Sequence, residues 1–245
     1  MSLTIDENRT PGPDQPEDSP RPAGVAQSEA TPFWRRPWII PLFLVTGAFL
    51  YLQAVPFAGT PEAEAPIPAH DGFAAYYPLL LTHIGLGTVA MVTACLQVWP
   101  WLRRNHAAVH RVSGRIYVLA TVISAVCGLI ILPFAPVVGQ LGAFMSTTLW
   151  LITTLVGYWA VRTGRYALHR RFMLYSFALV MNNIWGRGAA EIIFGFGIDM
   201  DFTYLGEGAR WIGWVMDLIL VQWFLYRTAG RPVEGPVRRL ARVRD

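Results

Sequence analysis

The sequence is poor in charged residues and contains no lysine. Charged residues make up 15% of the 245-residue chain, against 53% hydrophobic residues, and the mean hydropathy is +0.37. Because a soluble domain carries charge on about a quarter of its residues, this deficit excludes an ordinary soluble domain and indicates a membrane protein. All 20 basic residues are arginines, a bias typical of GC-rich bacterial genomes, and we draw no function from it.

Recognisable catalytic motifs are also lacking. The chain contains no nucleophile elbow, no phosphate-binding glycine loop, no dinucleotide fingerprint and no metal-ligand motif. Its two cysteines, Cys95 and Cys127, lie in apolar segments at depths that differ too much for a disulfide, and we interpret them as small packing residues. The sequence therefore assigns no catalytic residue, and it leaves open whether the protein is an enzyme.

Six apolar segments lie between two polar ends. Residues 1–33 contain six prolines and six acidic residues, which predicts a disordered tail, and residues 228–245 form a basic cytoplasmic tail. Residues 34–227 predict an all-α, polytopic membrane domain with its helices in one bundle, because segments of about 20 residues can cross a hydrocarbon core of about 30 Å. The predicted spans are residues 37–57, 76–99, 116–136, 141–161, 172–195 and 210–226.

The arginines indicate how these spans are oriented. They cluster at residues 35–36, 103–115, 162–171 and 227–244, whereas the loops at 58–75 and 197–207 are acidic. By the positive-inside rule, both termini lie in the cytoplasm of a multi-pass protein of the cell inner membrane. We expect the lipid bilayer as a partner, with anionic headgroups at the arginine-rich side, and no nucleic acid. The sequence does not indicate an oligomeric state.

A polar face on the fifth segment predicts a site inside the membrane. Asn183, Arg187 and Glu191 repeat at helical spacing, and charge that faces lipid is unfavourable. Arg187 and Asp217 are expected at one depth on sequential helices and should form an ion pair, with Glu191 as a second acceptor. His83, on the second segment at a similar depth, completes the predicted intramembrane polar site.

A second group of residues lies at the cytoplasmic ends of two segments. His110 and His169 share a depth and could ligate the iron of a b-type haem. The same histidines, together with Arg111, Arg115 and Arg170, could instead form an anion site for phosphate, a lipid headgroup or a carboxylate. Arginines at cytoplasmic helix ends also set orientation without any ligand, so the three interpretations stay open.

Two stretches carry a resemblance to a known family. HRVSGRIYVLA (residues 110–120) and LWLITTLVGYWAVRTGRYALHRRFML (residues 149–174), with Arg187 downstream, resemble a family of bacterial predicted membrane proteins of unknown function. The resemblance covers about residues 73–190. It implies an integral protein of the cell membrane and supplies no activity.

A looser similarity is to b-type cytochromes built on four membrane helices, whose four ligands lie on successive helices. His83, His110 and His169 could match three of these ligands, but the fourth segment contains no histidine. The repeated His-Arg pair, at 110–111 and 169–170, also hints that segments two–three and four–five are two copies of one hairpin.

Three classes of function are compatible with these patterns. The polar face of the fifth segment favours a transporter-like or proton-coupled protein, and the two histidines favour a haem-binding redox protein. A structural or accessory membrane subunit requires only the packing.

Overall fold

The computed structural model describes residues 38–67, 73–197 and 201–229, and these residues form helices and turns without a strand. Both predicted tails lie outside the described residues, apart from Thr228 and Ala229. The prediction of an all-α fold is confirmed. The α-helices are α1 (Ile39–Ala54), α2 (Tyr76–Val98), α3 (Pro100–Asn105), α4 (Ala107–Ile131), α5 (Gln140–Arg162), α6 (Tyr166–Gly195) and α7 (Phe202–Arg227). Short 3₁₀ turns extend α1 (η2, Val55–Phe57) and α4 (η4, Leu132–Phe134), and a third follows α1 (η3, Glu62–Glu64).

Four helical segments of the described chain are long and apolar enough to cross a membrane. They are residues 39–57, 76–98, 107–134 and 140–162, and they correspond to the first four predicted spans. Helices α6 and α7, with 30 and 26 residues, are long enough but carry more charged residues. Their crossing of the membrane stays a prediction.

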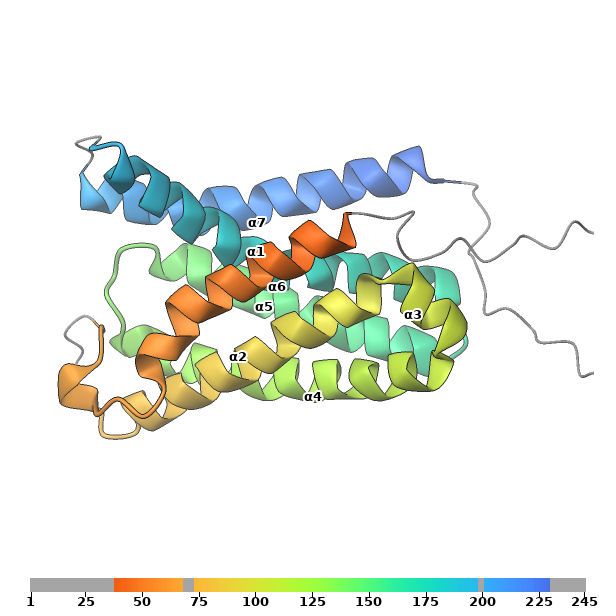
Figure 1. Cartoon of the computed structure of the whole chain (residues 1–245), viewed down its shortest axis with the longest axis horizontal. Helices are drawn as coiled ribbons and strands as arrows, with labels where there is room; N and C mark the ends of the chain where they lie inside the picture. Colours follow the sequence, from red (N-terminus) through yellow and green to blue (C-terminus); the bar gives the residue numbers. More distant parts are fainter. Residues whose placement is uncertain (1–37, 68–72, 198–200, 230–245) are drawn as a thin grey trace, which may run out of the picture. The chain divides into compact units, whose positions relative to one another are not determined.

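Helices α2, α4, α5 and α6 form the centre of the bundle (Figure 1). The most extensive contacts are within two hairpins, α2 with α4 and α5 with α6, and contacts of α4 with α5 and of α2 with α6 close the ring. Helix α1 packs on α2, and α7 packs on α6 and α5. Short connections make sequential helices antiparallel neighbours. Between α5 and α6, for example, Gly164 (φ 75°) ends α5 with a bond from Arg165 N–H to Ala160 O at 2.8 Å.

The bundle has two chemically different ends. The acidic end comprises residues 55–67, 132–139, 195–197 and 201–205, and the arginine end comprises residues 99–106 and 162–166. These ends lie at opposite sides of Figure 1. The two arginine clusters that the structure describes in full, at residues 103–115 and 162–171, therefore begin at the same end. Which side of the membrane each end faces stays a prediction.

Helix α7 begins earlier than the sequence predicted. The acidic stretch before Arg210, expected as a loop, is helical from Phe202 onward. Asp201 caps this helix by accepting a hydrogen bond from Thr203 N–H at 2.7 Å, and Glu207 accepts one from Gly139 N–H at the start of α5, also at 2.7 Å. Carboxylates are favourable at helix N-termini, so these acids stabilise helix ends although their low hydropathy suggested a loop.

Small residues set the crossing of α6 and α7. A Cβ added at Gly186 would lie 2.7 Å from Ala209 O, and one at Gly213 would lie 2.9 Å from Asn182 O. Such close backbone approach is typical of glycine contacts between membrane helices. The two contacts also fix the register, because Gly186 lies level with Ala209 and Asn182 lies level with Gly213.

Candidate functional site

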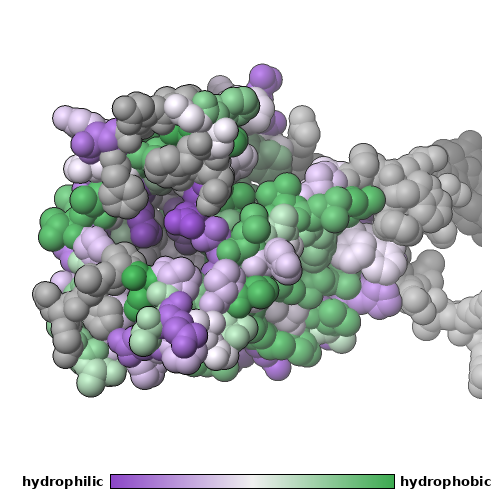
Figure 2. All heavy atoms as spheres, turned by 60° about the vertical axis from the view of Figure 1, so that its left-hand side comes forward, coloured by the Kyte–Doolittle hydropathy of each residue, from purple (hydrophilic) through white to green (hydrophobic). Residues whose placement is uncertain are grey.

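The main candidate site is an interhelical cavity of about 310 Å³ near the acidic end, between α1, α2, α4, α5, α6 and α7. Apolar side chains make up most of its wall. The polar side chains that line it are Gln53, Tyr76, His83, Thr88, Ser124, Ser146, Thr147, Asn182, Asn183 and Arg210. Figure 2, with this end turned forward, shows hydrophilic residues set back in a hollow between apolar surfaces. We call this space the interhelical cavity.

Arg210 is the one arginine among the described residues of the cavity wall, and none of the others carries a fixed charge. It lies over the start of α5, where a Cβ at Gly142 would be 3.1 Å from Arg210 Cβ and a Cβ at Gly139 would be 2.4 Å from Arg210 Cγ. The two glycines thus leave room beside the start of α5 for the Arg210 side chain, which lines the cavity and is exposed. Among the described residues no carboxylate pairs with Arg210, and Arg187 lies within electrostatic range as a like charge.

His83 is held in one orientation by α4. Its Nδ1 lies 2.8 Å from Ser124 O and 3.2 Å from Ser124 Oγ, while the Ser124 hydroxyl donates to His83 O at 2.9 Å. Gly128 leaves space for the ring, since a Cβ there would lie 2.8 Å from Nδ1. A hydrogen bond to a carbonyl oxygen requires a proton on Nδ1, so in the neutral ring Nε2 is an acceptor.

The cavity brings together two of the predicted intramembrane site residues, His83 and Asn183. Asn182, beside Asn183, also lines the cavity and donates from Nδ2 to Leu179 O at 2.6 Å. Arg210 is the lining residue that sequence reasoning missed, because it was taken as the flank of the sixth span. Arg210 lies between two small residues of α7, Ala209 and Gly213, at which α6 approaches closely. These small residues could have indicated that this part of α7 packs against another helix.

The predicted ion pair between Arg187 and Asp217 is not the contact found at Asp217. Asp217 is buried, its Oδ1 accepts a hydrogen bond from Trp185 Nε1 at 3.0 Å, and its Oδ2 has no hydrogen-bond partner among the described residues. The register of α6 and α7 gives the reason. Arg187 lies level with Gly208, nine residues or about 13 Å from Asp217 along α7, which is two residues farther than Trp185, whose long side chain reaches the carboxylate.

The sequence prediction started the last helix at Arg210 instead of Phe202, so it placed Asp217 at the wrong depth and paired it with Arg187. The Glu191 side chain lies outside the described residues. Neither Arg187 nor Asp217 lines the interhelical cavity.

His110 and His169 come close enough to interact electrostatically at the arginine end, one from α4 and the other from α6. His169 Nδ1 lies 2.8 Å from Gly157 O, whereas His110 Nδ1 is buried without a hydrogen-bond partner among the described residues. Of the predicted anion-site arginines, Arg111 and Arg115 are exposed on α4, and Arg170 is half-buried on α6. The two histidines thus lie within electrostatic range of one another, and whether all five residues form one site stays a prediction.

A buried polar layer separates these histidines from the interhelical cavity. Tyr117 hydroxyl bonds Ser176 Oγ across the bundle, Trp150 Nε1 donates to Tyr117 at 3.1 Å, and Thr154 Oγ1 lies 2.6 Å from Ser176 Oγ. All four side chains are buried. Tyr117 and Ser176 each follow the histidine of their own helix by seven residues, so the repeated His-Arg pair contained the signal that could have found them.

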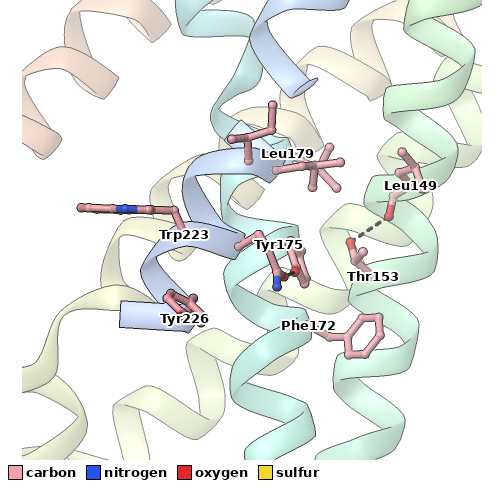
Figure 3. A pocket seen from close by; sticks show the side chains of 10 residues that line it. Leu149, Thr153, Phe172, Tyr175, Leu179, Trp223 and Tyr226 are labelled. Carbon is pink, nitrogen blue, oxygen red and sulfur yellow. Dashed lines mark hydrogen bonds between the residues drawn. The ribbon is translucent and has the colours of Figure 1, made fainter. Parts of the chain in front are cut away.

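An apolar groove of about 840 Å³ lies on α5, α6 and α7 toward the arginine end (Figure 3). Leu149, Phe172 and Trp223 are among the side chains around it, and Tyr175 hydroxyl donates to Gln222 Oε1 across the α6–α7 contact. Its wall contains no charged residue. In a membrane such a surface contacts acyl chains, and it provides no candidate chemistry.

The described fold is that of a polytopic α-helical membrane protein with a polar cavity inside an apolar bundle, and its surface contacts the lipid bilayer. The chain belongs to the family described as predicted membrane protein (DUF2306), which it matches over residues 80–225. The matched stretch runs from α2 to α7 and includes most of the cavity wall. Neither the curated proteins nor the solved structures contain a match to this chain, so the looser similarity to b-type cytochromes stays a prediction.

Proposed function

We propose that this protein is a six-span protein of the cell inner membrane that binds a small solute in the interhelical cavity, as a transporter-like protein does. Helices α6 and α7 serve as the fifth and sixth spans. Their extensive contacts with each other, and that of α6 with the apolar helix α5, support this assignment. Their charged residues need no exposure to lipid if the cavity and the two ends of the bundle accept them.

The observation that carries the proposal is the placement of polar groups in the cavity wall. Polar groups that face lipid, or that are buried without partners, cost free energy, so packing alone would favour apolar side chains at these positions. His83, Asn183 and Arg210 come from three different helices and line one space. Convergent polar groups in a largely apolar cavity of about 300 Å³ or more are typical of a small-molecule site.

The buried polar layer supports a transporter-like role. Trp150 lines the cavity and donates a hydrogen bond to Tyr117, so the other side chains of the layer lie behind this part of the cavity wall. A transporter holds its substrate near the middle of the membrane and closes one side at a time. A cavity near the acidic end, closed by side chains toward the arginine end, has the arrangement of one such state.

The test is whether water-soluble reagents reach the cavity from the acidic end. Thr147 lines the cavity, whereas Ile152, on the same helix, is exposed on the outer surface of the bundle. In a cysteine-free background, Thr147→Cys should react with a membrane-impermeant thiol reagent in intact membranes. Ile152→Cys should not react, because lipid covers it. Equal protection of both cysteines would contradict a solute-accessible cavity.

A haem-binding redox protein is the second candidate, favoured by the proximity of His110 and His169. The bond from His169 Nδ1–H to Gly157 O leaves Nε2 as an acceptor, as in histidines that ligate metals. Against this candidate, neither the interhelical cavity nor the apolar groove includes these histidines. Bound haem b would supply one-electron chemistry, and the two side chains would hold it by their imidazoles.

An absorption spectrum separates the two candidates. Protein purified from haem-replete cells should show a reducible Soret band if His110 and His169 ligate haem, and His169→Ala should abolish it. His83→Ala, a control histidine in the cavity, should leave the band unchanged. A colourless protein would remove the redox candidate.

A further inference from the structure

We infer that the ligand of the interhelical cavity is a small monocarboxylate with an apolar body, and that Arg210 binds its carboxylate. This inference rests on the proposed function, because it names the substrate class of the same site. It is carried by the charge balance of the cavity wall and by the apolar character of the rest of that wall.

Among the described residues of the cavity lining, Arg210 carries the only formal charge, and no aspartate or glutamate is present. The acid nearest in sequence on the same helix, Glu207, has its Oε1 bound to Gly139 N–H at the start of α5.

The shape of the guanidinium specifies the kind of anion. Its planar fork of N–H donors fits the two oxygens of a carboxylate or a phosphate in a bidentate arrangement. The amides of Asn182 and Asn183 and the hydroxyl of Ser146 add neutral groups to the same wall. These groups can orient an oxyanion and add no charge.

The rest of the wall selects a carboxylate over a phosphate. Phe49, Leu80, Met91 and Leu179 line the cavity together with Trp150. A dianionic phosphate would lose its hydration against such side chains, and one arginine would compensate only part of its charge. A short monocarboxylate places its single charge at Arg210 and its hydrocarbon part against these apolar side chains. His83 Nε2 is an acceptor, so it cannot donate a hydrogen bond to an ionised carboxylate. The carboxylate is therefore expected at Arg210 on α7.

The experiment is a thermal unfolding assay on the purified full chain in detergent at constant ionic strength. Acetate, butyrate and benzoate are compared with butyramide, benzamide, phosphate and chloride. Butyrate or benzoate should raise the midpoint in a saturable manner, because a ligand that binds the folded state stabilises it. Arg210→Gln should weaken this apparent affinity by about 10- to 100-fold, the range for a charge-assisted hydrogen bond.

Arg227→Gln is the matched control, because Arg227 lies on the same helix and packs on the Trp223 ring outside the cavity lining. It should leave the effect of butyrate unchanged. If Arg210→Gln does not fold, Arg210→Lys retains the charge without the planar fork and should bind more weakly than wild type. The comparison of acids with amides in the wild-type protein needs no variant.

The inference is overturned if the amides stabilise as well as the acids, if phosphate stabilises more than any carboxylate, or if no carboxylate acts. Labelling of Thr147→Cys separates this failure from that of the proposed function. A reactive Thr147→Cys with no response to carboxylates leaves a solute cavity whose ligand is not a carboxylate. An unreactive one removes the cavity as a site altogether.

Discussion

The contact between α6 and α7 can be tested by measuring which residue is energetically coupled to Asp217. The structure joins Asp217 Oδ1 to Trp185 Nε1 at 3.0 Å, whereas depth counting from the sequence joined Asp217 to Arg187. Two double-mutant cycles distinguish these arrangements. The first combines Trp185→Phe with Asp217→Leu, and the second combines Arg187→Gln with the same Asp217→Leu.

The expected magnitudes follow from the geometry. A hydrogen bond to a carboxylate is worth about 1.5–3 kcal/mol in soluble proteins. Side-chain hydrogen bonds between membrane helices average about 0.6 kcal/mol and reach about 1.7, because the unfolded chain in the membrane also finds partners. Asp217 is only 6% exposed, so we expect a coupling of about 1 kcal/mol with Trp185. Arg187, about 13 Å away along α7, should be additive with Asp217 within about 0.3–0.5 kcal/mol.

The assay is the free energy of unfolding in mixed micelles, measured by titration with a denaturing detergent. Loss of ring volume in Trp185→Phe appears in both arms of its cycle and cancels, so the coupling reports the contact with Asp217. A coupling above 1 kcal/mol with Arg187, together with additivity at Trp185, would refute the register of α6 and α7 described above. It would restore the ion pair that the sequence suggested.

Two more predictions concern the packing and the orientation of the bundle. Gly186→Ala should lower stability by about 1–3 kcal/mol because its Cβ would lie 2.7 Å from the backbone oxygen of Ala209, whereas Gly188→Ala on the same helix meets open space and should be neutral or stabilising by up to about 1 kcal/mol; equal effects in thermal unfolding would contradict the close helix crossing. For orientation, single cysteines at the exposed residues Ala63 and Thr203 should react with an impermeant thiol reagent added to whole cells, and one at the exposed residue Thr163 should react only after lysis; the opposite pattern would reverse the predicted topology.

Composition predicted the class of the fold, and the positions of arginine predicted that the clusters at residues 103–115 and 162–171 lie at one end. Those properties depend on hydropathy, which is local along the chain. The contacts of Asp217 and Arg210 depend on where α7 begins, and a hydropathy window does not locate a helix start that lies between two acidic residues, Asp201 and Glu207. Asp201 and Glu207 bind backbone N–H groups at helix starts. Their charge lowers the hydropathy of this stretch, so the first two turns of α7 were predicted as a loop. His83 and Asn183, which the sequence assigned to one site, both line the interhelical cavity, and each lies well inside a strongly apolar or strongly periodic segment.

The bond between Tyr117 and Ser176 has a consequence for the relation between the two hairpins. Both residues occupy the same position after a His-Arg pair, on helices that face each other across the bundle, yet one side chain is large and the other is small. Two tyrosines at these positions would compete for one space, and two serines would leave the space between α4 and α6 partly empty. The fit therefore requires the two hairpins to differ at this level. If the two hairpins descend from one ancestral hairpin, the substitutions at these two positions had to compensate one another in volume. A hairpin with tyrosine would then require a hairpin with serine as its neighbour.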